Sequence, residues 1–363
     1  MFYLPLFFLV IYLLYIFLIT SGLFRHSRLR ISSQEDTPKV SVVIAARNEE
    51  LNLPYLIQDL VIQEYPIDRL EVIFIDDRST DSTYNILKEA ADNYAFIKYI
   101  KIENFNKNMT PKKNALSKGI EMASGEIILT TDADCRVGKL WVSSMTYSVK
   151  NKNSITIGFS EITLEKNSFF ELYQKMDFLA IIVTNAGAAG WNYFWSGTGQ
   201  NLAFLKKDYL EINGFEKVKN RISGDDMYLV QSISKNKNGY IHIDPYSFVK
   251  TKPMSTVSEF LNQRIRWSSN AKFNIKNNPL FFGFLATSFC LNIYIFLSII
   301  LGGNWIWVFL FKFFSDGIVI FLGSKLFERK LDPFIYCLWA LAQPLYIPLI
   351  GLLGIKEKFT WKP

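Results

Sequence analysis

The chain has 363 residues, a formal net charge of +7 and a composition that is 50% hydrophobic and 16% aromatic. Several lysines and arginines flank long apolar segments, as on the cytoplasmic side of membrane proteins, so the positive charge does not indicate a nucleic-acid partner. The three cysteines lie far apart, which excludes a disulfide framework and a cysteine-based zinc site. The length predicts two domains, or one domain and a second module.

The first apolar segment is predicted to be a membrane anchor. Residues 2–19 carry no charge and are about long enough to span a bilayer. Arg25, Arg28 and Arg30 follow this run, whereas a signal peptide would carry its positive charge before it. We therefore predict a retained anchor over residues 1–24 with the N-terminus outside and the chain from residue 25 in the cytoplasm. A cleaved signal peptide is the alternative.

Strands and helices alternate in the segment after the anchor. Short buried strands are predicted at residues 40–45, 70–75, 97–102 and 126–131, and helices between them at 53–62, 80–91 and 112–122. This alternation predicts a parallel sheet covered on both faces, with ligands bound beyond the carboxyl ends of the strands. No GxGxxG sequence follows the first strand, which argues against a dinucleotide site of the Rossmann type.

Residues 127–136, IILTTDADCR, combine a buried strand with two carboxylates at its exit. Alternating residues of an extended segment point the same way, so Asp132 and Asp134 can share one cation. Mg²⁺ and Mn²⁺ bind one or two carboxylates and take their remaining ligands from water and phosphate. The pattern indicates a clamp for a metal and a diphosphate, and a solvated turn rich in aspartate is the alternative.

The next part of the chain mixes apolar and glycine-rich segments. Residues 177–191 are too short and too interrupted to span a membrane, which predicts a core helix or one that leans on the bilayer. The glycine-rich turn WSGTGQNLA at 195–203 leads into a short strand, and an acidic cluster at 224–226 precedes a helix at 227–234. Residues 255–270 predict an amphipathic helix, which either lies in the membrane interface or packs on the domain.

The C-terminal part contains further apolar spans. We predict spans at about 280–301 and 305–322, with Lys312 and Asp316 of the second span paired four residues apart. Residues 333–355 form a last apolar segment, interrupted by two prolines, that crosses the membrane or dips in and returns. Basic residues after it favour a cytoplasmic tail, so the orientation of this end is left open.

Five sequence elements stand in a characteristic order along the chain. They are VSVVIAARNEE at 40–50, IDDRSTDS at 75–82, KKNAL at 112–116, TDAD at 131–134, and GDD at 224–226 followed by QRIRW at 263–267. This set resembles the family 2 glycosyltransferases with the GT-A fold, in their membrane-integral branch. The resemblance implies an α/β GT-A nucleotide-sugar-binding domain at 38–250, an interface helix with the QxxRW motif at 251–278, and transmembrane helices at 1–24 and 279–355.

The resemblance also implies a nucleotide-binding set. The backbone around Ala46 and Arg47 and the carboxylate of Glu49 match the family's nucleoside contacts, and Asp76 or Asp77 would accept hydrogen bonds from the base. Lys112 matches the lysine that usually precedes an Ala-Leu pair and would lie near the nucleotide. The family often has glycine before this lysine, and Pro111 stands there in this chain.

The remaining motifs imply the chemistry of transfer. Asp132 and Asp134 would hold Mg²⁺ or Mn²⁺ against the diphosphate, with Asp134 as the direct ligand. Asp226, in an Asp-Asp pair where the family usually has Glu-Asp, would be the general base, although capping of the following helix is the alternative. Gln263, Arg266 and Trp267 share one helix face, where Arg266 would meet the diphosphate and Trp267 would stack on a sugar.

The predicted enzyme is an inverting, metal-dependent glycosyltransferase. It would move a sugar from a UDP-sugar to a membrane-associated acceptor, a lipid or lipid-linked glycan, as an integral protein of the cell membrane with its catalytic domain in the cytoplasm. The QxxRW pattern also occurs in processive polysaccharide synthases, but about four spans are few to enclose a channel unless a second copy or a partner subunit contributes. A nucleotidylyltransferase would lack the Gln-Arg-Trp helix, and a non-catalytic scaffold would need neither Asp134 nor Asp226.

Overall fold

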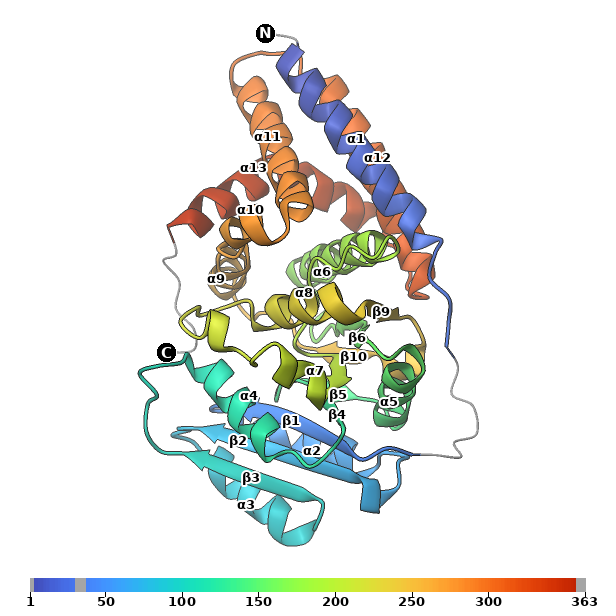
Figure 1. Ribbon diagram of the computed structural model, residues 1–363. Helices are drawn as coiled ribbons and strands as arrows, with labels where there is room; N and C mark the ends of the chain where they lie inside the picture. The colour runs from blue at the N-terminus through green and yellow to red at the C-terminus, as the bar shows by residue number, and fades with distance from the viewer. Residues whose placement is uncertain (1–2, 30–36, 357–363) are drawn as a thin grey trace. The chain divides into compact units, whose positions relative to one another are not determined.

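The computed structural model describes residues 3–29 and 37–356, which form two compact units (Figure 1). The helical unit comprises Met1–Arg25, Leu164–Trp195 and Pro253–Pro363. The α/β unit comprises His26–Thr163 and Ser196–Lys252. Each unit is described below by itself.

Within the described residues, the α/β unit contains a seven-stranded sheet of order β3-β2-β1-β4-β8-β6-β9. Its parallel part consists of β1 (Val40–Ala46), β2 (Leu70–Asp77), β3 (Ile97–Ile102) and β4 (Ile127–Thr130), as the alternation of elements predicts. The remaining strands are β8 (Leu202–Leu205), antiparallel to β4, then β6 (Ile155–Gly158), antiparallel to β8, and β9 (Gly239–His242), parallel to β6. The whole sheet is therefore mixed.

A second, three-stranded sheet and six α-helices complete the α/β unit as far as it is described. The small sheet pairs β5 (Arg136–Val137), β10 (Val249–Thr251) and β7 (Ser160–Ile162). The helices are α2 (Leu53–Val61), α3 (Thr83–Asn93), α4 (Pro111–Met122), α5 (Trp141–Lys152), α7 (Lys206–Glu211) and α8 (Asp225–Lys237).

Alternation along the central strands places apolar side chains on both faces of the sheet. On one face Val42 and Phe74 belong to a buried cluster that includes Leu56 of α2 and Trp141 of α5. On the other face α4 packs so closely that a Cβ atom at Gly119 would lie 2.5 Å from side-chain atoms of β1 and β2. Burial on both faces explains why these strands are almost wholly apolar up to their carboxyl ends.

Glu71 is a buried carboxylate near the start of β2 that joins neighbouring segments. It accepts hydrogen bonds from Ser41 on β1, from the Ser124 hydroxyl at 2.7 Å and from Lys98 on β3 at 2.8 Å. Burial opposes its ionisation, but these hydrogen bonds outweigh that penalty and lower the pKa of Glu71 to about 2. Its ionised form is therefore favoured by folding.

We expect the Glu71 carboxylate to stabilise the fold in a pH-dependent way. Because its pKa is lower in the folded chain than in the unfolded chain, its contribution is present above about pH 4.5 and is lost as the pH falls towards 2. Glu71→Gln should cost on the order of 3 kcal/mol at pH 7 and flatten this acid dependence. Thermal unfolding between pH 2 and 7 measures both effects, with the exposed Glu103→Gln as control. Equal acid sensitivity of wild type and Glu71→Gln would contradict this role.

The helical unit contains, among the described residues, four helices long and apolar enough to cross a membrane. They are α1 (Tyr3–Leu23), α11 (Pro279–Ile300), α12 (Ile306–Leu326) and α13 (Pro333–Ile355), and the unit also holds α6 (Phe169–Ala189), α9 (Val257–Ser268) and α10 (Asn274–Asn277). These bounds match the apolar spans expected from the sequence. The last segment is one helix that includes both Pro344 and Pro348.

Two features of the helical unit involve contacts with α1. The expected pair forms between Lys312 and Asp316 of α12, whose side chains are both 7% exposed, and Asp316 also accepts a hydrogen bond from Tyr12 of α1 at 2.6 Å. Gly187 does not break α6 but marks its crossing with α1, because a Cβ atom there would lie 2.4 Å from the Ile19 side chain. Small residues at this position allow the two helices to approach closely.

Candidate active site

The carboxyl ends of β1 and β2 place the predicted nucleoside-binding residues side by side. Ala46 pairs with Asp76 in the ladder between the strands. Asp76 is fully buried, its Oδ1 accepts from the Ser79 amide at 3.1 Å, and its Oδ2 has no hydrogen-bond partner among the described residues. Asp77 is instead held by both Nε and Nη2 of Arg78. Of the two aspartates, Asp76 thus keeps an acceptor oxygen for a ligand.

The loops that follow these two strands are joined by hydrogen bonds. Asn48 adopts a left-handed conformation, with φ of 52°, and its Oδ1 accepts from the Thr80 amide at 2.8 Å. The amide of Glu49 donates to Thr83 Oγ1 at 2.8 Å, and its buried carboxylate accepts from Asn52 at 2.7 Å. Arg47 is half-buried at the start of the first loop. The predicted residues therefore share one rim of the sheet on a braced pair of loops.

Lys112 is the centre of a charged cluster at the same edge. Its Nζ lies 2.8 Å from Oδ1 of Asp132, after β4, and 3.9 Å from Oδ2 of Asp225, in the first turn of α8. The next residue, Asp226, accepts a hydrogen bond from the Gly199 amide at 3.2 Å, and the Gly199 carbonyl accepts one from Thr130 at 3.0 Å. Three motifs distant in sequence therefore meet here: KKNAL, TDAD and GDD.

The electrostatics of the cluster favour a proton acceptor at Asp226. Burial and the neighbouring Asp225 carboxylate raise the pKa of Asp226 to about 6, although Lys112 and two backbone amides act against this shift. Asp132 and Asp225 raise the pKa of Lys112 despite its burial, so this side chain stays cationic. The helix begins at Asp225, two residues earlier than predicted, with Gly224 preceding it at φ of 79°. Asp226 can thus lie in the first turn of α8 and still act as a general base.

The TDAD turn presents two half-exposed carboxylates, Asp132 and Asp134. The turn is anchored by Arg136, which forms two hydrogen bonds to Asp59 of α2 at 2.6 and 2.7 Å. The buried Cys135 thiol lies 3.7 Å from Oδ1 of Asp134, and burial raises the pKa of this thiol, so it is an inert neighbour.

The donor set of this turn fits a metal that is completed by its substrate. Among the residues that the structure describes, no group of three or more His, Cys, Asp or Glu side chains could hold a metal ion. Two accessible carboxylates beside a lysine do suit Mg²⁺ or Mn²⁺, which take their other ligands from diphosphate and water. Asp132 and Asp134 are the residues that would hold such an ion.

Lys113 is a site residue that the sequence analysis missed. Its side chain is 1% exposed, and its Nζ donates to the carbonyl of Arg221, in the loop that leads to Asp225. Burial lowers the pKa of Lys113 to about 8. Two adjacent lysines at the start of a helix point in different directions, and the sequence alone does not show which one turns inward.

The QxxRW residues Gln263, Arg266 and Trp267 lie on α9 of the helical unit. The helix begins with the capping box of Thr256 and Glu259, which fixes its start at Val257. Gln263 accepts a hydrogen bond from Arg264, and the Arg264 guanidinium covers the ring of Trp267. The contacts of this motif with a diphosphate or a sugar stay a prediction.

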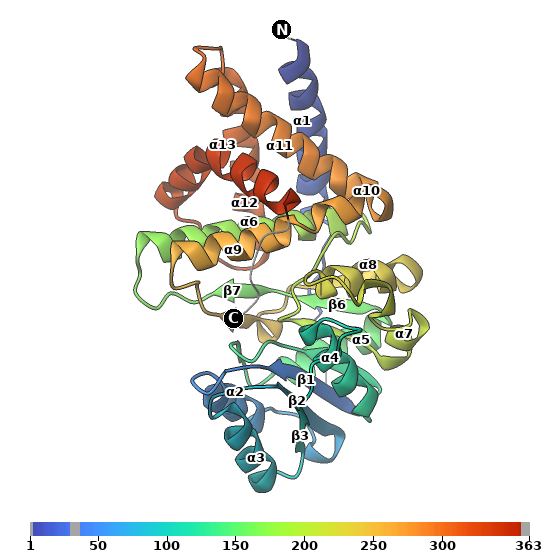
Figure 2. The same cartoon turned by 90° about the vertical axis from the view of Figure 1, so that its left-hand side faces the viewer.

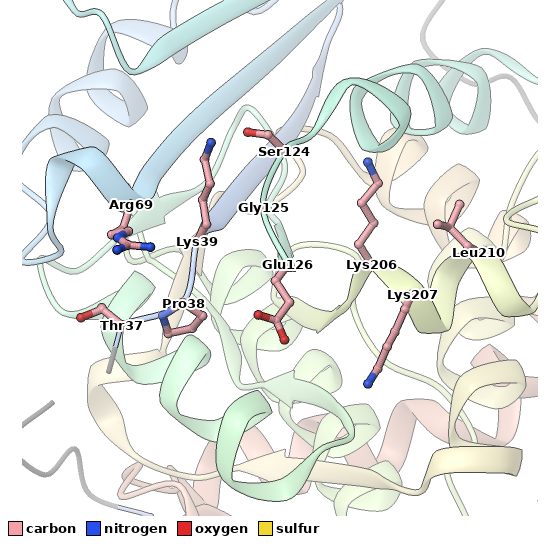
Figure 3. A pocket seen from close by; sticks show the side chains of 10 residues that line it. All are labelled: Thr37, Pro38, Lys39, Arg69, Ser124, Gly125, Glu126, Lys206, Lys207 and Leu210. Atoms are coloured by element: carbon pink, nitrogen blue, oxygen red, sulfur yellow. The ribbon is translucent and has the colours of Figure 1, made fainter. Parts of the chain in front are cut away.

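A pocket of about 540 Å³ lies at the opposite, amino-terminal edge of the sheet. Figure 3 shows Lys39, Arg69 and Glu126 around it, and these residues precede β1, β2 and β4. It contains none of the predicted site residues. In parallel sheets ligands bind beyond the carboxyl ends of the strands, so the Lys112 cluster, and not this pocket, is the candidate active site.

Comparisons with known proteins bear on the family and the fold of the chain. Residues 41–213 match the model described as Glycosyl transferase family 2. The chain is 26% identical over 247 residues to the probable glycosyltransferase YdaM of Bacillus subtilis, covering 66% of this chain and 57% of that protein. It is 38% identical over 104 residues to beta-monoglucosyldiacylglycerol synthase of Nostoc, covering 29% of this chain and 22% of that protein. The chain thus spans less than two thirds of these relatives.

A solved structure has the same fold. The mannosyltransferase PcManGT of Pyrobaculum calidifontis, determined with GDP-Man and Mn²⁺, superposes with a TM-score of 0.59 at 17% identity, covering 96% of this chain and 95% of that one. Residues 41–213 accordingly resemble a family 2 glycosyltransferase domain, and the α/β unit that carries them has the GT-A fold.

Proposed function

We propose that this protein is an inverting, metal-dependent glycosyltransferase that moves a sugar from a UDP-sugar to a membrane-associated acceptor, a lipid or lipid-linked glycan. The observation that carries the proposal is the cluster in which Lys112 links Asp132 to Asp225, beside Asp226. A scaffold would have no use for a half-buried carboxylate whose pKa is raised to about 6 next to an acidic turn.

Each residue of the rim has a role in the proposed reaction. The unpartnered oxygen of Asp76 would accept a hydrogen bond from the base, while Ala46, Arg47 and Glu49 border the nucleoside. Asp132 and Asp134 would hold Mg²⁺ or Mn²⁺, which when bound offsets the charge that develops on the departing diphosphate.

Asp226 would take the proton of the acceptor hydroxyl as that oxygen attacks the anomeric carbon. The new bond forms on the face opposite the departing nucleoside diphosphate, so a single displacement inverts the configuration. Lys112 would fix the positions of Asp132 and of the Asp225-Asp226 pair through its ion pairs, and it would lie near the nucleotide. Arg266 and Trp267 would complete the donor and sugar contacts.

The membrane helices and the relatives favour a lipid acceptor. Four helices are long and apolar enough to cross a membrane, and one relative is named for the synthesis of a glucosyldiacylglycerol. A processive polysaccharide synthase is the second candidate, because such enzymes also carry QxxRW.

A radiolabel screen on native membranes tests donor and acceptor together. Labelled UDP-glucose, UDP-galactose, UDP-GlcNAc and GDP-mannose are supplied to membranes that contain the wild type or Asp226→Asn. We expect an organic-extractable product from a UDP-sugar in the wild type only. Insoluble product would favour the polysaccharide synthase, and a GDP-mannose product would overturn the choice of nucleotide. The absence of both transfer and donor hydrolysis would favour the scaffold.

The proposed topology places the chain from residue 25 up to the start of α11 in the cytoplasm and the α11–α12 connection outside. The buried Cys135 cannot report this, so we choose exposed positions, Lys88 on α3 and Asn304 between α11 and α12. A membrane-impermeant maleimide should label Asn304→Cys in intact cells, and Lys88→Cys only after permeabilisation. Labelling of Lys88→Cys in intact cells, or a mature chain that starts after residue 20, would sink the topology.

A further inference from the structure

Arg264 lies inside the QRIRW sequence, and its side chain is 4% exposed. Its Nη1 donates to Oε1 of Gln263 at 2.7 Å, and its guanidinium carbon lies 4.2 Å from the centroid of the Trp267 ring. One buried side chain therefore contacts two of the three motif residues. A hydrogen bond fixes which way the Gln263 amide faces, and a cation over an indole restricts the ring.

Arg264 is itself held by a buried carboxylate on another helix. Its Nε donates to Oδ2 of Asp177 on α6 at 2.7 Å. Asp177 also accepts hydrogen bonds from two residues of α13, from Trp339 at 3.1 Å and from Tyr346 at 3.2 Å. Figure 2 shows α6 and α9 running side by side with α13 next to them. The Asp177 carboxylate thus connects α13 to Arg264 and so to the QxxRW motif.

Stability alone is a weak reason for this arrangement. Removing a buried ion pair from water costs much of the free energy that its attraction supplies. Well-packed apolar side chains in the same place often stabilise a fold equally. Nη2 of Arg264 moreover has no hydrogen-bond partner among the described residues, which is unfavourable for a buried donor. What the pair does supply is a fixed direction for the side chains of Gln263 and Trp267.

We propose that Arg264 is a positioning residue that holds the Gln263 amide and the Trp267 indole in the orientation used for transfer. Arg264 is supported by Asp177, which is held in turn by Trp339 and Tyr346 of α13. In this proposal α13 contributes to catalysis in addition to anchoring the protein. This inference rests on the proposed function, in which Gln263 and Trp267 contact the substrates.

A mutant cycle on the full-length enzyme tests the inference. Transfer is measured for Arg264→Met, for the pair Gln263→Ala with Trp267→Leu, and for all three changes combined. We expect Arg264→Met to lower kcat about 10- to 100-fold, the range that a misplaced substrate contact costs. The triple variant should be no slower than the pair, because the same contacts are lost.

The outcomes separate the two proposals. If the rate loss of the triple variant equals the product of the losses for Arg264→Met and for the pair, Arg264 acts independently of the motif. That result would overturn the inference. If the pair alone leaves transfer unchanged, the assigned role of QxxRW fails, whatever Arg264→Met does.

A milder comparison guards against misfolding of the Arg264 variant. Tyr346→Phe and Tyr12→Phe each remove one phenol hydrogen bond to a buried aspartate of the helical unit, Asp177 and Asp316 respectively. Both should lower the unfolding temperature, but only Tyr346→Phe should lower kcat, by about fivefold, as expected for one lost hydrogen bond. Equal kcat values for the two variants would overturn the role of α13.

Discussion

Asp134→Ala is expected to abolish sugar transfer while the protein still inserts and folds. A bound divalent ion contributes several kcal/mol of charge stabilisation, and each ~1.4 kcal/mol is a factor of ten, so we expect a loss of about 10³-fold or more. The turn should keep its shape without this carboxylate, because Arg136 and Asp59 anchor it from the other side. Transfer assays over a range of Mn²⁺ concentrations measure the loss.

A second readout separates metal binding from turnover. Binding of Mn²⁺ to the UDP complex, followed by calorimetry, should be lost in Asp134→Ala. It should be retained in Asp68→Ala, which removes a carboxylate that is 76% exposed. Transfer that persists without divalent metal, or a fully active Asp134→Ala, would falsify the metal clamp.

The parallel half of the fold was predictable because burial on both faces leaves a strong local signal. The strand expected at 97–102 is observed as Ile97–Ile102, and the helix expected at 112–122 as Pro111–Met122. The antiparallel β8 was not expected to join this sheet. It enters through a glycine-rich turn with no strand–helix alternation, and its pairing with β4 joins residues more than 70 positions apart. Periodicity within a short window carries no information on such pairing.

The candidate site was predictable at the level of motifs but not of partners. Asp132 and Asp226 follow from residue type and order along the chain. The position of Lys112 between Asp132 and Asp225, and the buried pair of Arg264 with Asp177, depend on tertiary packing. Asp177 and Arg264 are 87 residues apart, so no local pattern links them.

Asp226→Asn is expected to slow transfer by about 10²–10⁴, the usual contribution of a general base. The amide keeps the size of the side chain but cannot take a proton, and the rim proposed to bind UDP is unchanged. UDP affinity should therefore survive, as measured by calorimetry. A loss of UDP binding in Asp226→Asn would instead place the GDD segment in the donor pocket.

The pH profile gives an independent test of the same residue. A base must be deprotonated to act, and burial together with Asp225 raises the pKa of Asp226 to about 6. The kcat/KM of the wild type should therefore fall about tenfold per pH unit below this value and level off above it. The residual activity of Asp226→Asn should lack this step. A step of the same position in both enzymes would assign the titration to another group.

Arg266→Ala is expected to affect UDP affinity and the pH step of kcat/KM in the opposite pattern to Asp226→Asn. In the proposed complex its guanidinium donates charge-assisted hydrogen bonds to the diphosphate, each contributing about 1.5–3 kcal/mol. Removing it should weaken UDP binding by about 10- to 150-fold and lower the rate with it, while leaving the pH step near 6 in place. Arg266→Ala with normal UDP affinity, beside an Asp226→Asn that has lost it, would show that the two roles are exchanged. The diphosphate would then be bound from the GDD segment, and the α9 motif would serve the acceptor.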